Sequence, residues 1–156
     1  MKKFRTVPNV PKTKAEKISD RAYLPLTLAS MVYSVFLPIK LDTFWFYWGL
    51  AIWVLSLVIG VIVFVSFCTA PLGELVTKGI YRVSRNPACL SGFLADIGIG
   101  IACASWVFLL YAVLEIILMR ISIGPEERFL LEKYGGKYRE YVNRTPRWIG
   151  IPKSQK

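Results

Sequence analysis

Two polar segments hold most of the residues able to do chemistry, and one long apolar run separates them. The first segment, residues 79–87, carries a tyrosine, two arginines and an asparagine before a proline. The second segment, residues 125–148, carries two adjacent glutamates and then spaced tyrosines and arginines. Arginine forks bind carboxylates, and aromatic faces stabilise cations. If the run between them enters the membrane and returns, both segments emerge on one face and can build a single polar site.

The composition is typical of a polytopic membrane protein. Of the 156 residues, 54% are hydrophobic, and the mean hydropathy is +0.46. The net charge of +10 indicates cytoplasmic loops and anionic lipid head groups, because the basic residues flank apolar runs and form no nucleic-acid reading surface. No nucleic acid is expected as a partner. The chain has no histidine, and Cys68, Cys89 and Cys103 form no CxxC pair, so neither a metal site nor imidazole catalysis is expected.

The first half of the chain predicts a basic arm and two spans. Residues 1–20 are rich in lysine and read as a flexible or surface-lying cytoplasmic arm. The first span, residues 22–39, is at the lower limit of length for a crossing, and Pro25 falls in its first turn, where a missing N–H costs little. The second span, residues 44–69, begins with an aromatic belt of the kind found at membrane interfaces.

The apolar run from Cys89 to Ile121 is predicted to form a helical hairpin. As one helix it would reach about 50 Å, against a hydrocarbon core of about 30 Å. Two crossings, residues 89–104 and 106–121, with the tip at Ala104–Trp106, place every basic cluster in the cytoplasm, as the positive-inside rule prefers. The fold class predicted is all-α, a polytopic integral membrane protein with four transmembrane helices and both termini cytoplasmic.

The remaining residues, 122–156, form the cytoplasmic tail of a single domain that covers residues 21–156. Glu126 through Tyr141 is predicted to be a cytoplasmic C-terminal helix, because its apolar and aromatic residues recur at three- and four-residue spacing. We expect this helix to lie against the membrane surface or over the hairpin. The pair Gly135-Gly136 weakens it and can break it in two.

Taken in order, these motifs resemble the integral-membrane methyltransferases, which include the isoprenylcysteine carboxyl methyltransferases and the phospholipid methyltransferases. The set is Gly-x-Tyr-Arg-x-Ser-Arg-Asn-Pro, an apolar hairpin, Pro-Glu-Glu-Arg, Tyr-Gly-x-x-Tyr-x-x-Tyr and Pro-Arg-Trp, over residues 72–150. The resemblance implies S-adenosyl-L-methionine (SAM) as the cofactor, held at the cytoplasmic ends of the last two spans and by the C-terminal segment. It also implies a methyl acceptor that enters from the lipid.

The resemblance also suggests roles for individual residues. Arg85, Asn86 and Glu127 are predicted to be catalytic. Residues 146–148 are expected to tether the tail, with Arg147 as an additional contact to the cofactor. The predicted cofactor-binding residues are Tyr81, Arg85, Asn86, Pro87, Glu126, Glu127, Tyr138, Tyr141 and Arg144.

Two departures from the family pattern bear on the chemistry. Many members have Arg-His-Pro where this chain has Arg85-Asn86-Pro87, a form similar to a bacterial variant that implies a prokaryotic cell membrane. Many members follow the proline with Met-Tyr, where this chain has Ala88-Cys89. The missing tyrosine affects the acceptor side of the site more than cofactor binding.

Each group of site residues also has a purely structural interpretation. The two glutamates after Pro125 suit the first turn of a surface helix. Arg85 and Asn86 can be a positive flank with an N-cap asparagine at the start of a span. The tyrosines can be ordinary anchors at the membrane interface.

Two carboxyl residues, Asp96 and Glu115, lie inside predicted spans, where ionisable groups are costly and usually functional. Counted from a tip near Ser105, they lie at similar depth and are expected to face each other across the hairpin. Their predicted role is substrate binding or proton acceptance, and the alternative is a hydrogen-bonded structural pair. Close helix packing is expected at Gly92, Gly98 and Gly100.

The predicted function is SAM-dependent methyl transfer to a lipid-like or prenylated acceptor at the cytoplasmic membrane face. The acceptor is of the isoprenylcysteine carboxylate or the phospholipid amine type. A carboxylate acceptor is already an anion and needs no histidine, whereas an amine must be neutral or lose a proton to a base. Two alternatives stay open. One is an NADPH enzyme similar to the membrane sterol reductases, which are usually much longer, and the other is a non-catalytic scaffold or lipid-binding relative.

Overall fold

The computed structural model describes residues 11–71 and 73–150, and these residues contain helices and no strand. The predicted all-α fold is confirmed for this part of the chain. The elements are α1 (Lys14–Val35), α2 (Phe44–Cys68), the short 3-10 helix η1 (Gly79–Arg82), α3 (Pro87–Ala102), α4 (Trp106–Tyr134) and α5 (Gly136–Arg144).

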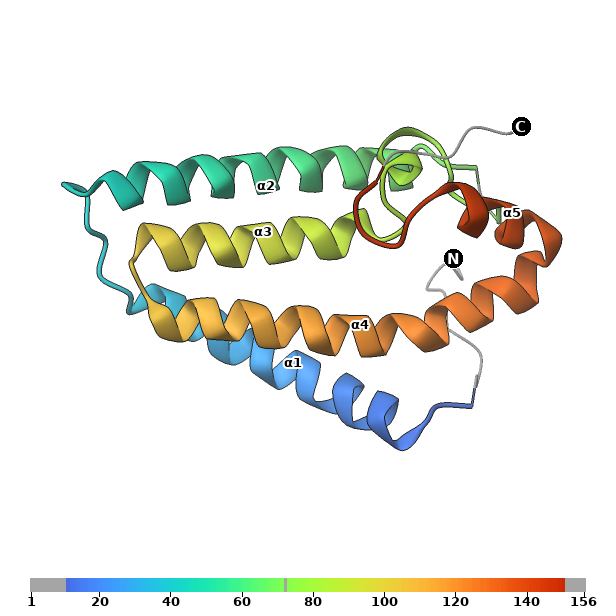
Figure 1. Cartoon of the computed structure of the whole chain (residues 1–156), viewed down its shortest axis with the longest axis horizontal. Helices are drawn as coiled ribbons and strands as arrows, with labels where there is room; N and C mark the ends of the chain where they lie inside the picture. The colour runs from blue at the N-terminus through green and yellow to red at the C-terminus, as the bar shows by residue number, and fades with distance from the viewer. Residues whose placement is uncertain (1–10, 72, 151–156) are drawn as a thin grey trace.

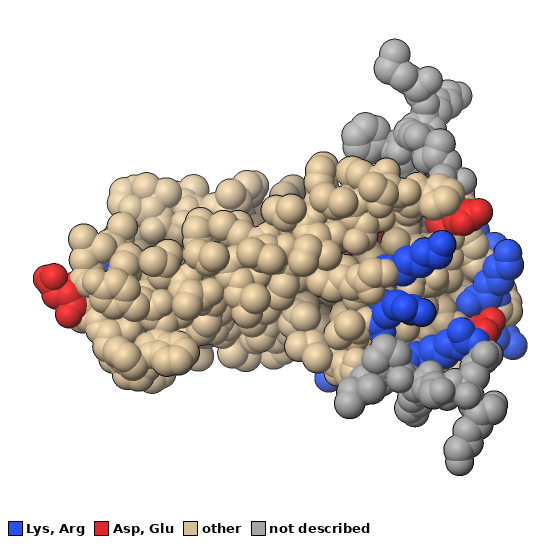
Figure 2. All heavy atoms as spheres, turned by 90° about the horizontal axis from the view of Figure 1, so that it is seen from above, with Lys and Arg blue, Asp and Glu red and all other residues tan. Residues whose placement is uncertain are grey.

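Four long helices lie side by side in the spatial order α2, α3, α4 and α1 (Figure 1). The predicted hairpin is present, since α3 and α4 run in opposite directions on either side of a turn at residues 103–105. The start of α1, the loop of residues 69–86, the end of α4 and α5 all lie at one end of the molecule (Figure 1). Lys and Arg side chains gather over that same end in Figure 2. The hairpin therefore brings both polar segments to one charged end.

Two of the described helices, α2 and α4, are long and apolar enough to cross a membrane. They contain the predicted spans 44–69 and 106–121 almost completely. α3 has 16 residues, or about 24 Å, which is shorter than a hydrocarbon core of about 30 Å. α1 carries charged residues in its first two turns and does not meet the same test. Crossing by all four helices stays a prediction.

The outer surface of α2 supports a lipid environment for this helix. Large apolar side chains are exposed along its length, including Trp45 at 62%, Val61 at 61% and Phe64 at 68%. A continuous apolar surface of this kind is rare in soluble monomers and is typical of a membrane or interaction face. Of its two serines, Ser56 is buried and donates a hydrogen bond to the carbonyl of Trp53.

The first helix begins earlier and ends earlier than predicted. α1 starts at Lys14, because Thr13 and Glu16 form a capping box that satisfies free N–H groups of the first turn. Residues 14–20 are therefore helical and not a flexible arm, while residues 1–10 lie outside the described part of the chain. Pro25 lies in the middle of α1 and not in its first turn. It removes one backbone hydrogen bond there, a position where proline normally kinks or breaks a helix.

The last span and the tail helix are also arranged differently from the prediction. α4 is continuous from Trp106 to Tyr134, so the predicted span 106–121 and the first part of the predicted tail helix are one helix. Pro125 is buried inside α4 and does not begin a surface helix. The expected break occurs at Gly135, which adopts a φ of +53°, a backbone conformation that glycine adopts easily. α5 follows this turn.

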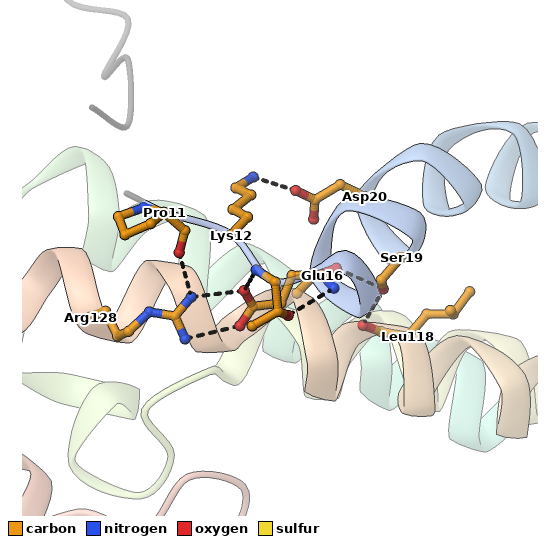
Figure 3. A network of polar contacts seen from close by, with 9 residues as sticks. Pro11, Lys12, Glu16, Ser19, Asp20, Leu118 and Arg128 are labelled. Carbon is orange, nitrogen blue, oxygen red and sulfur yellow. Dashed lines mark hydrogen bonds and ion pairs between the residues drawn. The ribbon is translucent and has the colours of Figure 1, made fainter. Parts of the chain in front are cut away.

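The start of α1 is held against α4 by a polar network that involves Glu16 and Arg128 (Figure 3). The Arg128 guanidinium donates hydrogen bonds of 2.9 and 2.8 Å to the two carboxylate oxygens of Glu16, a bidentate geometry that strengthens such pairs. Glu16 is only 7% exposed. One turn later, the hydroxyl of Ser19 donates to the carbonyl of Leu118 at 2.8 Å. These contacts fix the register of α1 on α4.

The Glu16 network predicts a specific loss of stability in acid. The Arg128 guanidinium and the N–H of Thr13 lower the pKa of Glu16 from 4.5 to about 2. Because the folded-state pKa is lowered, the contribution of Glu16 is fully present above about pH 5 and disappears as the pH falls to about 2. We expect the stability difference between the wild type and Glu16→Gln to shrink across this window. Unfolding followed by circular dichroism in detergent, at a series of pH values, measures this difference.

A matched control for this experiment is Lys12→Gln. Lys12 pairs with Asp20 at the surface, where both side chains are about one third exposed, and exposed ion pairs contribute little. We expect its pH profile to follow that of the wild type. A Glu16→Gln difference that stays constant from pH 7 to pH 2 would contradict the proposed role of the network.

Candidate functional site

A pocket opens at the charged end of the molecule, between the loop before α3, the end of α4 and α5. It contains eight of the nine residues that the resemblance singled out as cofactor-binding. Arg144 is the exception, since it does not line the pocket and pairs with Glu140 on α5. The eight residues are Tyr81, Arg85, Asn86, Pro87, Glu126, Glu127, Tyr138 and Tyr141.

The first polar segment is held in place by turns and by the tail. The N–H of Asn86 donates to the buried hydroxyl of Ser84 at 3.1 Å. The side-chain amide of Asn86 donates to the carbonyl of Arg147 at 3.3 Å and makes no capping bond to α3. Asn86 is therefore the N-cap residue of α3, as the structural interpretation expected, but its side chain binds the tail and does not cap the helix. Pro87 occupies the first turn of α3, where its missing N–H costs nothing.

The predicted tether at the end of the chain is present. The N–H of Arg85 donates to the carbonyl of Pro146 at 3.0 Å. The hydroxyl of Ser84 donates to the carbonyl of Arg147 at 3.4 Å. Thr145, just before this contact, is 4% exposed. The tail therefore packs directly on the loop that precedes α3 and holds that side of the pocket wall in place.

Arg85 and Glu127 in the pocket wall form a charged triad with Arg147, which does not itself line this pocket. Oε1 of Glu127 accepts from Nη1 of Arg85 at 3.0 Å and from Nε of Arg147 at 3.2 Å, and Oε2 accepts from Nη2 of Arg147. The hydrogen bond to Glu127 raises the pKa of Arg147. Nε of Arg85 is buried and has no hydrogen-bond partner among the described residues. The triad holds one positive charge in excess of its carboxylate.

Three tyrosines, Tyr81, Tyr138 and Tyr141, also line the pocket. The hydroxyl of Tyr141 donates to the carbonyl of Tyr81 at 2.7 Å, which joins α5 to η1. The rings of Tyr138 and Tyr141 lie 6.3 Å apart, and both residues are buried. Burial raises the pKa of all three tyrosines, so their hydroxyls stay protonated at neutral pH. The pocket therefore offers neutral aromatic faces beside charged groups.

Sequence reasoning missed about half of the residues that line the pocket. Glu74 could have been predicted as a pocket residue, since it lies in the same polar loop as Tyr81 and Arg85. The apolar lining residues could not, because the spacing of apolar residues does not show which side chains of a span turn towards a pocket. The missed residues are Phe67, Glu74, Leu75, Val76, Ala88, Cys89, Ile123 and Leu130.

The two carboxyl residues predicted to lie inside spans are close together, away from this pocket. Asp96 on α3 is near Glu115 on α4, as expected from their similar distance to the tip, and Oε2 of Glu115 is buried without a hydrogen-bond partner among the described residues. Glu115 is 4% exposed, and its Oε1 accepts a hydrogen bond of 3.2 Å from the hydroxyl of Tyr23. α1 therefore contributes to this polar cluster, which the sequence alone did not indicate. Neither carboxyl residue lines the pocket that holds Tyr81 and Glu127.

Residues 65–137 match the family model described as phospholipid methyltransferase. The resemblance to the membrane methyltransferases is confirmed. The methyltransferase segment runs from the end of α2 through η1, α3 and α4 to the start of α5. It contains the first polar segment, the hairpin and all three glutamates of the pocket, and it indicates a methyltransferase. No curated protein and no solved structure matches the chain.

Proposed function

We propose that the chain transfers a methyl group from SAM to a lipid-like or prenylated acceptor at the cytoplasmic face of the membrane. The observation that carries this proposal is the pocket, in which eight residues from two distant segments line one cavity. Six of the eight lie within the segment that matches the phospholipid methyltransferase family. The pocket lies at the charged end of the molecule, where the positive-inside rule favours the cytoplasm.

The groups around the pocket fit the chemistry of SAM. When bound, this cofactor supplies an electrophilic methyl group on a sulfonium cation. The faces of Tyr81, Tyr138 and Tyr141 would stabilise the cation, and the exposed carboxylate of Glu126 would hold the ammonium group or the ribose hydroxyls. Arg85 keeps an unpartnered Nε that suits a carboxylate or an adenine edge.

The size of the pocket sets a condition on binding. Its volume is about 200 Å³, below the range of about 300–1,000 Å³ for small-molecule sites. Binding of a nucleoside-sized cofactor therefore requires the pocket to widen. Glu74, Leu75 and Val76 line one wall and belong to a loop without helix or strand, which makes this wall the easiest to displace.

The protein would accelerate methyl transfer mainly by positioning the two reactants and by excluding water from them. Methyl transfer needs the acceptor atom in line with the methyl group, and holding two reactants in such a geometry lowers the barrier substantially. Asp96 and Glu115 are proposed to act on the acceptor side, by holding its cationic group or taking its proton. Their place between α3 and α4, next to the lipid-facing part of the molecule, supports this role over cofactor binding.

The function is tested by titration calorimetry of the full chain in detergent. We expect SAM to bind and NADPH not to bind. Binding of NADPH alone would favour a reductase, and binding of neither would favour a scaffold.

Labelled SAM incubated with a total lipid extract then identifies the acceptor by mass spectrometry. In that assay we expect Asp96→Asn to lower turnover by about 100-fold without changing SAM affinity.

The matched control for the acceptor side is Asp42→Asn. Asp42 is exposed in the turn between α1 and α2, at the opposite end of the molecule, and its loss should leave turnover unchanged. A loss of SAM affinity in Asp96→Asn would place this residue in the cofactor site and overturn the assignment. Full turnover in Asp96→Asn would show that Asp96 takes no part in the reaction. The carboxyl pair would then have a structural role only.

A further inference from the structure

A second cavity lies on the other side of Glu127, between α4, α5 and the tail. Its volume is about 580 Å³. The wall shared with the first pocket consists of Arg85, Glu127 and Tyr138, and the remaining lining residues are different. Four of the lining residues are arginines, at positions 85, 128, 139 and 147.

The charges around this cavity do not balance. Glu127 is shared by Arg85 and Arg147, and Glu16 pairs with Arg128. Arg139 is exposed on α5 and has no ion pair among the described residues. Two positive charges are therefore left without a carboxylate among the lining side chains and their ion-pair partners.

An unpartnered buried donor in the wall that the two cavities share is consistent with a missing acceptor in either of them. Nε of Arg85 is shielded from solvent and unpartnered among the described residues, although its Nη1 bonds to Glu127. Unsatisfied buried donors are rare and costly. An anion in the cavity would provide both the missing charge and a possible acceptor. Asn143 lines the same cavity and offers an uncharged amide donor.

We propose that this cavity binds a phosphate group. Several arginine guanidinium groups line this cavity, and a guanidinium group matches the oxygen geometry of phosphate better than a lysine ammonium group does. The cavity lies beside the end of α4, directly after the apolar part of that helix. In a membrane this is the level of the lipid phosphates, and basic pockets at that level bind anionic head groups. The ligand is therefore the phosphate of an anionic lipid or a soluble phosphate.

The test measures binding to the full chain in a nonionic detergent at 150 mM salt, about physiological ionic strength. The probes are inorganic phosphate, dioctanoyl-phosphatidylglycerol and dioctanoylglycerol, the last of which has the same chains and no phosphate. We expect phosphatidylglycerol to bind and dioctanoylglycerol not to bind. Inorganic phosphate binding with similar affinity would indicate a soluble source, and binding of the lipid alone would indicate a membrane source.

Arg139→Gln is the variant that isolates this cavity. Arg139 lines the second cavity and not the first pocket. Because its side chain is exposed, we expect the Arg139→Gln variant to fold as the wild type does. We expect its affinity for the phosphate probe to fall about fivefold, the effect of one basic residue near a membrane surface. Lys137→Gln removes the same charge from the same helix at an exposed position outside the cavity. We expect it to change the affinity less than twofold, about the size of a neutral surface change.

Three results would overturn the proposal. Equal losses in Arg139→Gln and Lys137→Gln would show general attraction to a basic protein. Equal binding of dioctanoylglycerol and phosphatidylglycerol would show chain binding without phosphate recognition. A loss of SAM affinity in Arg139→Gln, with no phosphate binding in the wild type, would assign the cavity to the cofactor. The proposal does not depend on methyl transfer, so an inactive protein that binds phosphate through Arg139 would still support it.

Discussion

Replacing Glu127 by glutamine is expected to abolish SAM binding and to lower the free energy of unfolding by about 2 kcal/mol. Glu127 accepts hydrogen bonds from both Arg85 and Arg147, and its side chain is 17% exposed. Without the carboxylate, two guanidinium groups face each other without compensation. Arg147 belongs to the segment that packs on the loop before α3, so the pocket loses its shape as well as a charge.

The neighbouring residue supplies the control. Glu126→Gln makes the same chemical change one position earlier, on an exposed side chain of the same pocket. We expect Glu126→Gln to weaken SAM binding, with an unfolding free energy within about 0.5 kcal/mol of the wild type. Titration calorimetry and thermal unfolding in detergent separate the two effects. If the Glu127→Gln protein has the stability and the SAM affinity of the wild type, the triad has no role in the site.

The sequence predicted the hairpin and the meeting of the two polar segments because both follow from length. An apolar run from Cys89 to Ile121 cannot cross once as a straight helix, so it turns back, and the turn lies at residues 103–105. The equal depth of Asp96 and Glu115 follows from the same count. These predictions needed no knowledge of side-chain packing.

The helix boundaries at Pro25 and Pro125 could not be predicted in the same way. A proline is common in the first turn of a helix, so the sequence alone predicts that Pro25 and Pro125 each lie in a first turn. Both lie inside helices, because the segments on either side are held by contacts from elsewhere in the chain. For α1 the holding contact is the Glu16–Arg128 pair, which joins residues more than 100 positions apart.

The predicted cofactor-binding residues before Gly135 all line one pocket, whereas one of those after it, Arg144, does not. Glu126 and Glu127 lie on α4, where helical periodicity fixes the direction of each side chain. After the turn at Gly135 the register of α5 depends on how the tail packs. Tyr138 and Tyr141 face the pocket, while Arg144 faces solvent. The tail arginine that contacts Glu127 is instead Arg147, which lies beyond the helix.

The packing of α2 on α3 depends on two glycines that face each other, Gly49 and Gly98. A Cβ atom on Gly98 would lie 2.8 Å from the backbone nitrogen of Trp53 and 2.9 Å from the carbonyl oxygen of Gly49. A Cβ atom on Gly49 would lie 2.5 Å from the carbonyl oxygen of Gly98. These atoms belong to helix backbones and cannot move aside as a side chain can. Small residues allow this close approach of helices.

Replacing either glycine by alanine is therefore expected to lower the free energy of unfolding by about 3 kcal/mol or more. The two helices must move apart at this contact, which lies near the start of α2 and the end of α3. Gly92→Ala is the control on the same helix. Its Cβ atom would meet only the Cε of Met119 at 3.7 Å, an ordinary contact.

Since alanine favours the helical conformation over glycine by about 1 kcal/mol, we expect Gly92→Ala to be neutral or stabilising. Thermal unfolding followed by circular dichroism, together with SAM titration, compares the three variants. Equal stability of Gly98→Ala and Gly92→Ala would mean that α2 and α3 are further apart than the structure places them.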